Sequence, residues 1–102
     1  MSTLHTVNKS PFSHTTLLSC LEVCGDNDGI LLIEDGVFGA VTSAPTTQQL
    51  KVAMARGITV YALSGDIKAR GLSAKLTPAI QITDYDGFVQ LSIKYRCVQS
   101  WY

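Results

Sequence analysis

The chain has 102 residues, of which 46% are hydrophobic and 16% charged, and its eight basic and eight acidic side chains give a formal net charge of zero. A chain of this length builds one hydrophobic core, so we expect a single domain over residues 1–102. The balanced, dispersed charges argue against direct nucleic-acid binding, which needs clustered Lys and Arg, and no apolar run approaches the roughly 20 residues of a membrane span.

The first third of the chain alternates strand-like and helical patterns. Residues 4–7 mix β-branched and apolar side chains before a Pro-containing loop, which predicts a strand. A helix is expected next, with Ser13 as its N-cap and leucines at helical spacing, until the Gly- and Asp-rich residues 25–29 end it. Residues 30–33 form a continuous apolar run, typical of a strand buried on both faces of a parallel sheet.

The same alternation continues to the end of the chain. Residues 37–41 fit a helical turn, and residues 48–56 predict a helix capped by Thr46 or Thr47 and ended by Gly57. The remaining predicted elements are a strand at 58–63, a short helix at 67–72, a strand at 80–83, a helix at 85–95 and a strand-like tail to residue 102. This order predicts a doubly wound α/β domain with a mainly parallel sheet flanked by helices.

Three cysteines are the only candidates for nucleophilic chemistry, because a thiolate can attack, or can carry sulfane sulfur as a persulfide. Cys20 and Cys24 follow helical spacing and share one helix face with Leu17 and Leu21, which favours burial. A buried cysteine usually behaves as a small inert hydrophobic residue. Cys97 lies in the predicted terminal strand beside no visible activating group, so spacing alone favours structural roles for all three.

Metal and cofactor binding are not expected from the local motifs. The Cys20-x3-Cys24 spacing is neither a CxxC redox motif nor half of a zinc knuckle. His5 in the first strand and His14 at the start of the next helix could approach a thiol or satisfy a local hydrogen bond. The chain also lacks both common glycine-rich nucleotide-binding loops.

Trp101 and Tyr102 are large amphipathic residues on a terminus that would otherwise fray. They could dock into the core of this chain or into a partner, and the sequence leaves both alternatives open. No secretory signal is visible at the N-terminus, so we expect a soluble cytoplasmic protein. A chain this apolar and neutral is also expected to associate with other subunits.

Several segments resemble the DsrH/TusB family in their order and spacing. They are residues 5–12 (HTVNKSPF), 31–37 (LLIEDGV), 60–63 (VYAL), 66–72 (DIKARGL), 84–89 (DYDGFV) and 98–101 (VQSW). The resemblance implies a DsrE/F/H-like fold and assembly with DsrE/TusD-like and DsrF/TusC-like subunits into a dimer of heterotrimers. Such a complex relays persulfide sulfur, and the carrier expected downstream is a DsrC/TusE-like protein.

The resemblance also implies a role for Cys20. In this family the main sulfur-carrying cysteine belongs to the DsrE/TusD-type subunit, and DsrH-type subunits have a second candidate on the first helix, where Cys20 lies. Cys20 is therefore the candidate sulfur acceptor, whereas Cys24 is outside the family pattern. Together with residues 8–12, Cys20 favours the DsrH branch and dissimilatory sulfur oxidation.

Two other functions remain open. The chain could be a non-catalytic structural subunit, or it could serve a TusB-type role in tRNA 2-thiouridine synthesis. Whether it transfers sulfur itself or only belongs to a sulfurtransferase complex is also left open by the sequence.

Overall fold

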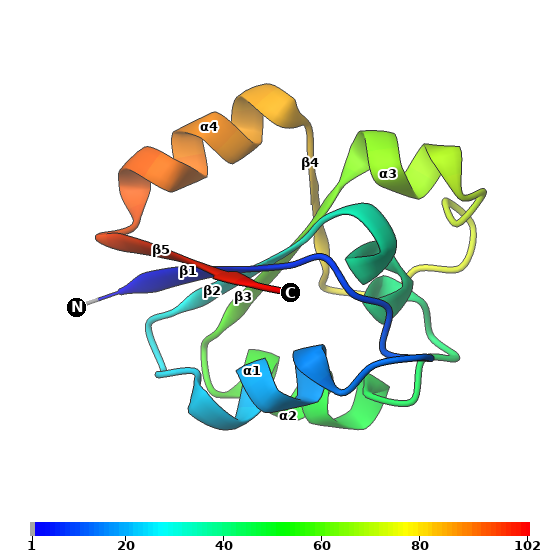
Figure 1. The fold of residues 1–102 in the computed structure, drawn as a ribbon, viewed down its shortest axis with the longest axis horizontal. Coiled ribbons are helices and arrows are strands. Elements are labelled where there is room, and N and C mark those ends of the chain that lie inside the picture. Colours follow the sequence, from blue (N-terminus) through cyan, green and yellow to red (C-terminus); the bar gives the residue numbers. More distant parts are fainter. Residues whose placement is uncertain (1) are drawn as a thin grey trace.

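Five parallel strands form one twisted sheet in the computed structural model, which describes residues 2–102 (Figure 1). The strands are β1 (Thr3–Val7), β2 (Gly29–Leu32), β3 (Thr59–Leu63), β4 (Gln81–Thr83) and β5 (Cys97–Trp101). Their order across the sheet is β4-β3-β2-β1-β5, and every neighbouring pair is parallel. The predicted α/β fold with a parallel sheet is confirmed.

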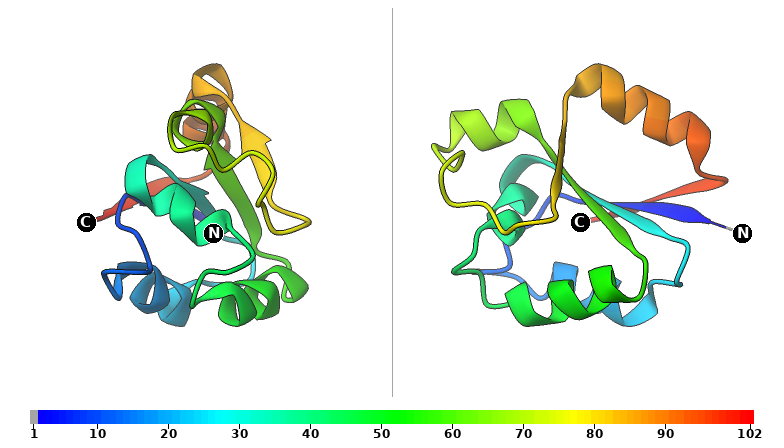
Figure 2. Two further views of the ribbon diagram at one scale, coloured as in Figure 1. Left: turned by 90° about the vertical axis from the view of Figure 1, so that its right-hand side faces the viewer. Right: turned by 180° about the vertical axis from the view of Figure 1, so that it is seen from behind.

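Helices cover both faces of this sheet. They are α1 (Thr16–Val23), the 3-10 helix η1 (Glu34–Ala40), α2 (Thr47–Ala55), α3 (Ser64–Ala69) and α4 (Tyr85–Lys94). Figures 1 and 2 show α1 and α2 side by side below the sheet, with α3 and α4 on its opposite side. Helices on both faces make the fold doubly wound, as predicted.

The helix boundaries follow the sequence signals with two clear exceptions. Helix α3 spans Ser64–Ala69 and so begins three residues before the helix expected at 67–72, because Ser64, Gly65 and Asp66 form its first turn and not a separate turn. The other exception is the start of α1. Ser13 is not the N-cap of α1, because Thr15 holds that position. Residues 10–14 instead form a turn in which the Ser10 carbonyl accepts from the amides of Ser13 and His14, at 3.3 and 3.0 Å. The Ser13 hydroxyl pairs with His14 Nδ1 at 2.9 Å, so the prediction of a Ser13 cap was wrong.

The other helix boundaries in the second half of the chain agree with the predictions. Thr46 is the N-cap of α2, and Gly57 follows its end with a φ of +101°, a conformation that glycine adopts readily. The Asp84 side chain caps α4 by accepting from the Gly87 amide at 2.8 Å. The helical turn expected at residues 37–41 is the later part of η1, which begins earlier, at Glu34.

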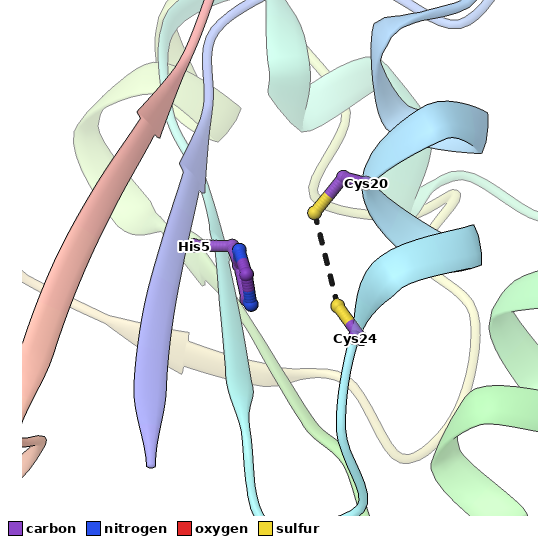
Figure 3. Close-up of side chains that lie close together, drawn as sticks. All are labelled: His5, Cys20 and Cys24. Carbon is purple, nitrogen blue, oxygen red and sulfur yellow. Dashed lines mark hydrogen bonds between the residues drawn. The ribbon is translucent and has the colours of Figure 1, made fainter.

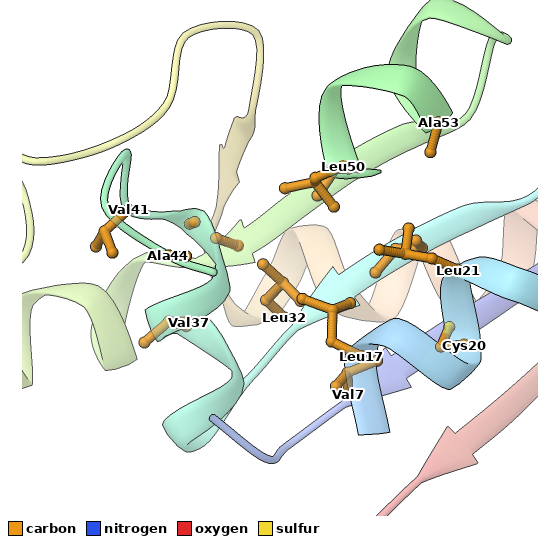
Figure 4. Packing of buried hydrophobic residues seen from close by; sticks show 14 of the residues in the cluster. Val7, Leu17, Cys20, Leu21, Leu32, Val37, Val41, Ala44, Leu50 and Ala53 are labelled. Carbon is orange, nitrogen blue, oxygen red and sulfur yellow. The ribbon is translucent and has the colours of Figure 1, made fainter. Parts of the chain in front are cut away.

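Two apolar clusters lie on the sheet. The larger core, which includes the residues of α1 and α2 that face the sheet, is seen from close by in Figure 4. The smaller core lies between α4 and the sheet and consists of Leu4, Leu31, Tyr61, Leu91 and Tyr95. Strand β2 contributes to both, because all four of its residues are buried and successive side chains point to opposite faces.

Candidate functional site

A pair of thiols lies where α1 packs on β1. Cys20 is on α1 and Cys24 is the residue that ends this helix, so the two side chains lie one turn apart on the same face. Their sulfur atoms are 3.8 Å apart, and both side chains point toward the sheet (Figure 3). Cys20 is completely buried and Cys24 is 5% exposed. The shared, buried helix face predicted from spacing is confirmed.

The two thiols differ in how readily they ionise. The hydrogen bond with Cys24, followed by burial, raises the pKa of Cys20 far above its ordinary value. The same bond lowers the pKa of Cys24, because the Cys20 S–H stabilises a thiolate there, and the nearby Arg56 guanidinium acts in the same direction. Cys24 therefore loses its proton before Cys20.

A chain of hydrogen bonds runs beside the thiols through His5. Trp101 Nε1 donates to His5 Nδ1 at 3.0 Å, and His5 Nε2 lies 2.8 Å from Asp28 Oδ2. An indole nitrogen can only donate, so Nδ1 must be the acceptor and Nε2 carries the proton toward Asp28. These two hydrogen bonds link β5, β1 and the residue that precedes β2.

Asp28 is held as a carboxylate by several donors. Its Oδ1 accepts from the Thr3 amide at 3.0 Å, and its Oδ2 accepts from the Gly25 amide at 2.9 Å as well as from His5. Burial opposes ionisation here, yet the bonds from His5, Gly25 and Thr3 hold the pKa of Asp28 below its ordinary value. The carboxylate thus fixes the tautomer and orientation of the His5 ring.

The packing of α1 against β1 brings His5 to the thiol pair. One ligand atom from each of His5, Cys20 and Cys24 lies within 4.8 Å of the other two, and all three residues are buried. Cys97 and His14 are exposed. Of the two alternatives for Trp101 and Tyr102, the structure shows docking into the same chain for Trp101, because its indole bonds to His5. Tyr102 is 85% exposed and does not dock into the core.

Comparison with known proteins identifies the family. Residues 9–98 match the family model described as DsrH like protein. The chain belongs to the DsrH/TusB family. The Protein TusB sequences of Enterobacter sp. strain 638, Sodalis glossinidius and Escherichia coli K12 are 39%, 38% and 36% identical to it, each over 96% of this chain and 99% of the relative. The resemblance found from sequence segments is therefore confirmed.

Solved structures agree on the fold. The ychN protein of E. coli superposes with a TM-score of 0.84 over 98% of this chain and 99% of its own, at 17% sequence identity. Protein MTH1491 of Methanobacterium thermoautotrophicum gives a TM-score of 0.74 over 96% and 97% of the two chains, at 13% identity. At these identities the likeness concerns the fold alone.

The predicted site residues lie in different parts of the structure. Of the predicted candidates, Cys20 lies in the cluster, whereas Cys97 is at the exposed sheet edge. His5 was considered from the sequence, but its contacts with Asp28 and the thiols were not predicted. Asp28 was read only as part of the Gly- and Asp-rich segment that ends the helix, and no local signal distinguishes it from Asp26.

Proposed function

We propose that this chain is a subunit of a heteromeric sulfur-relay complex. The observation that carries the proposal is the DsrH/TusB match over residues 9–98, supported by full-length relatives at 36–39% identity. The proposed partners are DsrE/TusD-like and DsrF/TusC-like subunits in a dimer of heterotrimers, with a DsrC/TusE-like protein as the sulfur carrier.

Within residues 2–102, none of the helices combines the length and apolarity that a bilayer crossing requires. We propose the cytoplasm as its location.

Within this complex, Cys20 is the proposed sulfur acceptor. Its pKa is raised by the bond to Cys24 and by burial, so Cys20 must first be separated from Cys24 and exposed before it can ionise. Its thiolate would then attack the outer sulfur of a partner persulfide, the donor's S–S bond would break, and the donor cysteine would leave as a thiolate. The position of Cys20 on α1, 3.8 Å from a second thiol, supports this role. Because the side chain is completely buried, the transfer requires α1 to move away from β1 when the donor subunit docks.

The burial of Cys20 also favours a second function. A thiol that no solvent reaches contributes to packing, as expected for a structural subunit that supports a docking surface while its partners carry the sulfur. Exposed apolar side chains along α4, namely Tyr85, Val89 and Ile93, are consistent with contact to other subunits in either case.

Intact-mass measurement separates these two functions. The three subunits are coexpressed, purified as a complex and treated with a persulfide donor. If Cys20 accepts sulfur, this chain gains the mass of one sulfur atom in the wild type and in Cys97→Ser, its exposed matched control, but not in Cys20→Ser. If the wild-type chain stays unmodified and the Cys20→Ser complex relays sulfur fully, Cys20 is not the acceptor and the structural function is supported. A chain that stays monomeric when the other subunits are supplied would contradict the relay proposal as a whole.

The pathway served by the complex is a separate proposal. The presence of Cys20 supports dissimilatory sulfur oxidation, whereas the curated relatives named TusB support a role in tRNA 2-thiouridine synthesis. Deleting the gene and measuring both sulfur oxidation and the 2-thiouridine content of tRNA distinguishes the two. Loss of 2-thiouridine with normal sulfur oxidation would favour the tRNA pathway, and the converse would favour oxidation.

A further inference from the structure

The thiol pair and His5 have the donor types and spacing of a metal site. The sulfur atoms of Cys20 and Cys24 are 3.8 Å apart. Two thiolates on a tetrahedral zinc ion, each bonded at roughly 2.3 Å, are separated by about 3.8 Å. One His5 ring nitrogen completes a group whose ligand atoms lie within 4.8 Å of one another. We propose that His5, Cys20 and Cys24 form a zinc-binding site.

Charge balance suits this site to its buried position. A buried ion is costly unless its charge is compensated. Two thiolates neutralise the dication, and the neutral imidazole of His5 adds a third bond without adding charge. Binding therefore displaces one proton from each of the two cysteines. Sulfur and imidazole donors suit zinc and disfavour magnesium and calcium, which prefer oxygen.

Asp28 provides the outer contact that zinc-bound histidines usually have. A ligating imidazole commonly donates its second N–H to a carboxylate, which fixes the ring and increases its basicity. His5 Nε2 already makes this contact with Asp28 at 2.8 Å. The remaining lone pair of the ring is on Nδ1, so this is the atom that binds the metal.

Zinc binding competes with Trp101, whose indole N–H now occupies Nδ1 at 3.0 Å. Trp101 is partly exposed and belongs to the edge strand β5, so it can leave without disturbing the centre of the sheet. Three protein ligands would leave a fourth coordination position for a further ligand. Since Trp101 is the only tryptophan of the chain, its fluorescence reports directly on this exchange.

The cysteine spacing is compatible with zinc when it is read on a helix. Two ligands at i and i+4 lie on one helical face, which is how the two histidines of an HExxH motif bind zinc. The usual zinc-knuckle rule concerns cysteines in a loop, so it did not identify Cys20 and Cys24. The third ligand comes from β1, fifteen residues before Cys20 (20 − 5).

Metal titration of the reduced full-length chain tests the proposal, with Zn²⁺ alone and Co²⁺ as a coloured substitute. We expect one ion per chain, a thiolate-to-cobalt absorption band and a change in Trp101 emission. Cys20→Ser and Cys24→Ser should each weaken zinc binding at least tenfold, and Asp28→Asn by about 10–100-fold. Cys97→Ser is the matched control and should bind as the wild type does.

X-ray absorption at the zinc edge keeps the test decisive if the cysteine variants fail to fold. Two sulfur ligands and one imidazole in wild-type and Cys97→Ser protein would support the site. A shell of oxygen and nitrogen alone, zinc binding unchanged in a folded Cys20→Ser/Cys24→Ser variant, or constant Trp101 emission at saturation would each overturn the proposal. All these measurements use the isolated chain and zinc, so a failure of the zinc proposal leaves the proposed membership of a sulfur-relay complex untouched. The two proposed roles of Cys20 exclude each other at any one time, because a thiolate bound to zinc has to leave the metal before it can accept sulfur.

Discussion

The two cores differ in how completely this chain covers them. The larger core is closed by α1 and α2, and its central side chains, such as Leu17, Leu32 and Leu50, are fully buried. The smaller core has five buried residues between α4 and the sheet, and that helix leaves Tyr85 and Ile93 at least 70% exposed. The larger core is therefore the main source of stability of the isolated chain, whereas apolar side chains on α4 remain exposed to solvent.

The largest expected effect is in the larger core. Leu17→Ala removes a fully buried side chain and leaves a cavity, so we expect the free energy of unfolding to fall by about 3 kcal/mol. Urea denaturation measures this change. Leu18→Ala is the control on the same helix, since Leu18 is partly exposed. Equal losses in the two variants would show that the larger core is not closed as described.

A smaller loss is expected for the partly buried carboxylate of Asp28, which lies beside this core. Asp28→Asn replaces an acceptor of three hydrogen bonds with a side chain that has only one acceptor oxygen, so one donor loses its partner. We expect a loss of about 2 kcal/mol in urea denaturation at neutral pH. Asp26→Asn is the matched control, because Asp26 forms only an exposed pair with Arg56 and should change stability by less than about 1 kcal/mol.

The smaller core is expected to respond to alkaline pH. Burial, followed by the hydrogen bond with Tyr61, raises the pKa of Tyr95 above its ordinary value. The neutral phenol is thus favoured in the folded state. Its contribution to the free energy of unfolding is complete below a pH of about 10 and declines above that pH, where Tyr95 ionises in the unfolded chain. Above a pH of about 10, the free energy of unfolding of the wild type should therefore fall more steeply with pH than that of Tyr95→Phe. The difference between the two slopes should be at most about 1.4 kcal/mol per pH unit. Parallel curves from urea denaturation between pH 9 and 11 would contradict this assignment.

The smallest effect is expected on the outer surface of α4. Ile93→Lys changes a side chain that is 74% exposed, so the free energy of unfolding should change by less than about 0.5 kcal/mol. Leu91→Lys, two residues earlier on the same helix, should unfold the smaller core because Leu91 is buried. If both variants were equally stable, α4 would not be packed on the sheet as described.

Sequence patterns predicted the elements well because their signals are local. The apolar run at residues 30–33 marks a strand buried on both faces, and Gly57 marks the end of α2 through a backbone conformation that suits glycine. Ser13 was misassigned because two nearby residues, Ser13 and Thr15, can both precede a helix. Only the turn at residues 10–14, which depends on the Ser10 carbonyl, decides between them.

The candidate site was predicted only in part, because its contacts span the chain. Helical spacing was sufficient to place Cys20 and Cys24 together. Trp101 and His5 are 96 residues apart, and their contact depends on the pairing of β5 with β1, in which Trp101 lies opposite Val7. No spacing rule encodes that register. Asp28 likewise reaches His5 only because β2 pairs with the other side of β1.

The place of β5 in the sheet has a consequence for biosynthesis. The first strand to leave the ribosome can pair with β2 early, but its other edge stays open until residues 97–101 have been translated and have emerged from the exit tunnel. The ring of His5 therefore receives its indole partner only after all the other strands have been made. In nascent chains arrested before Trp101, the thiols and Asp28 would lie beside a sheet edge that still lacks β5. The contacts around His5 are therefore the last of this sheet to form.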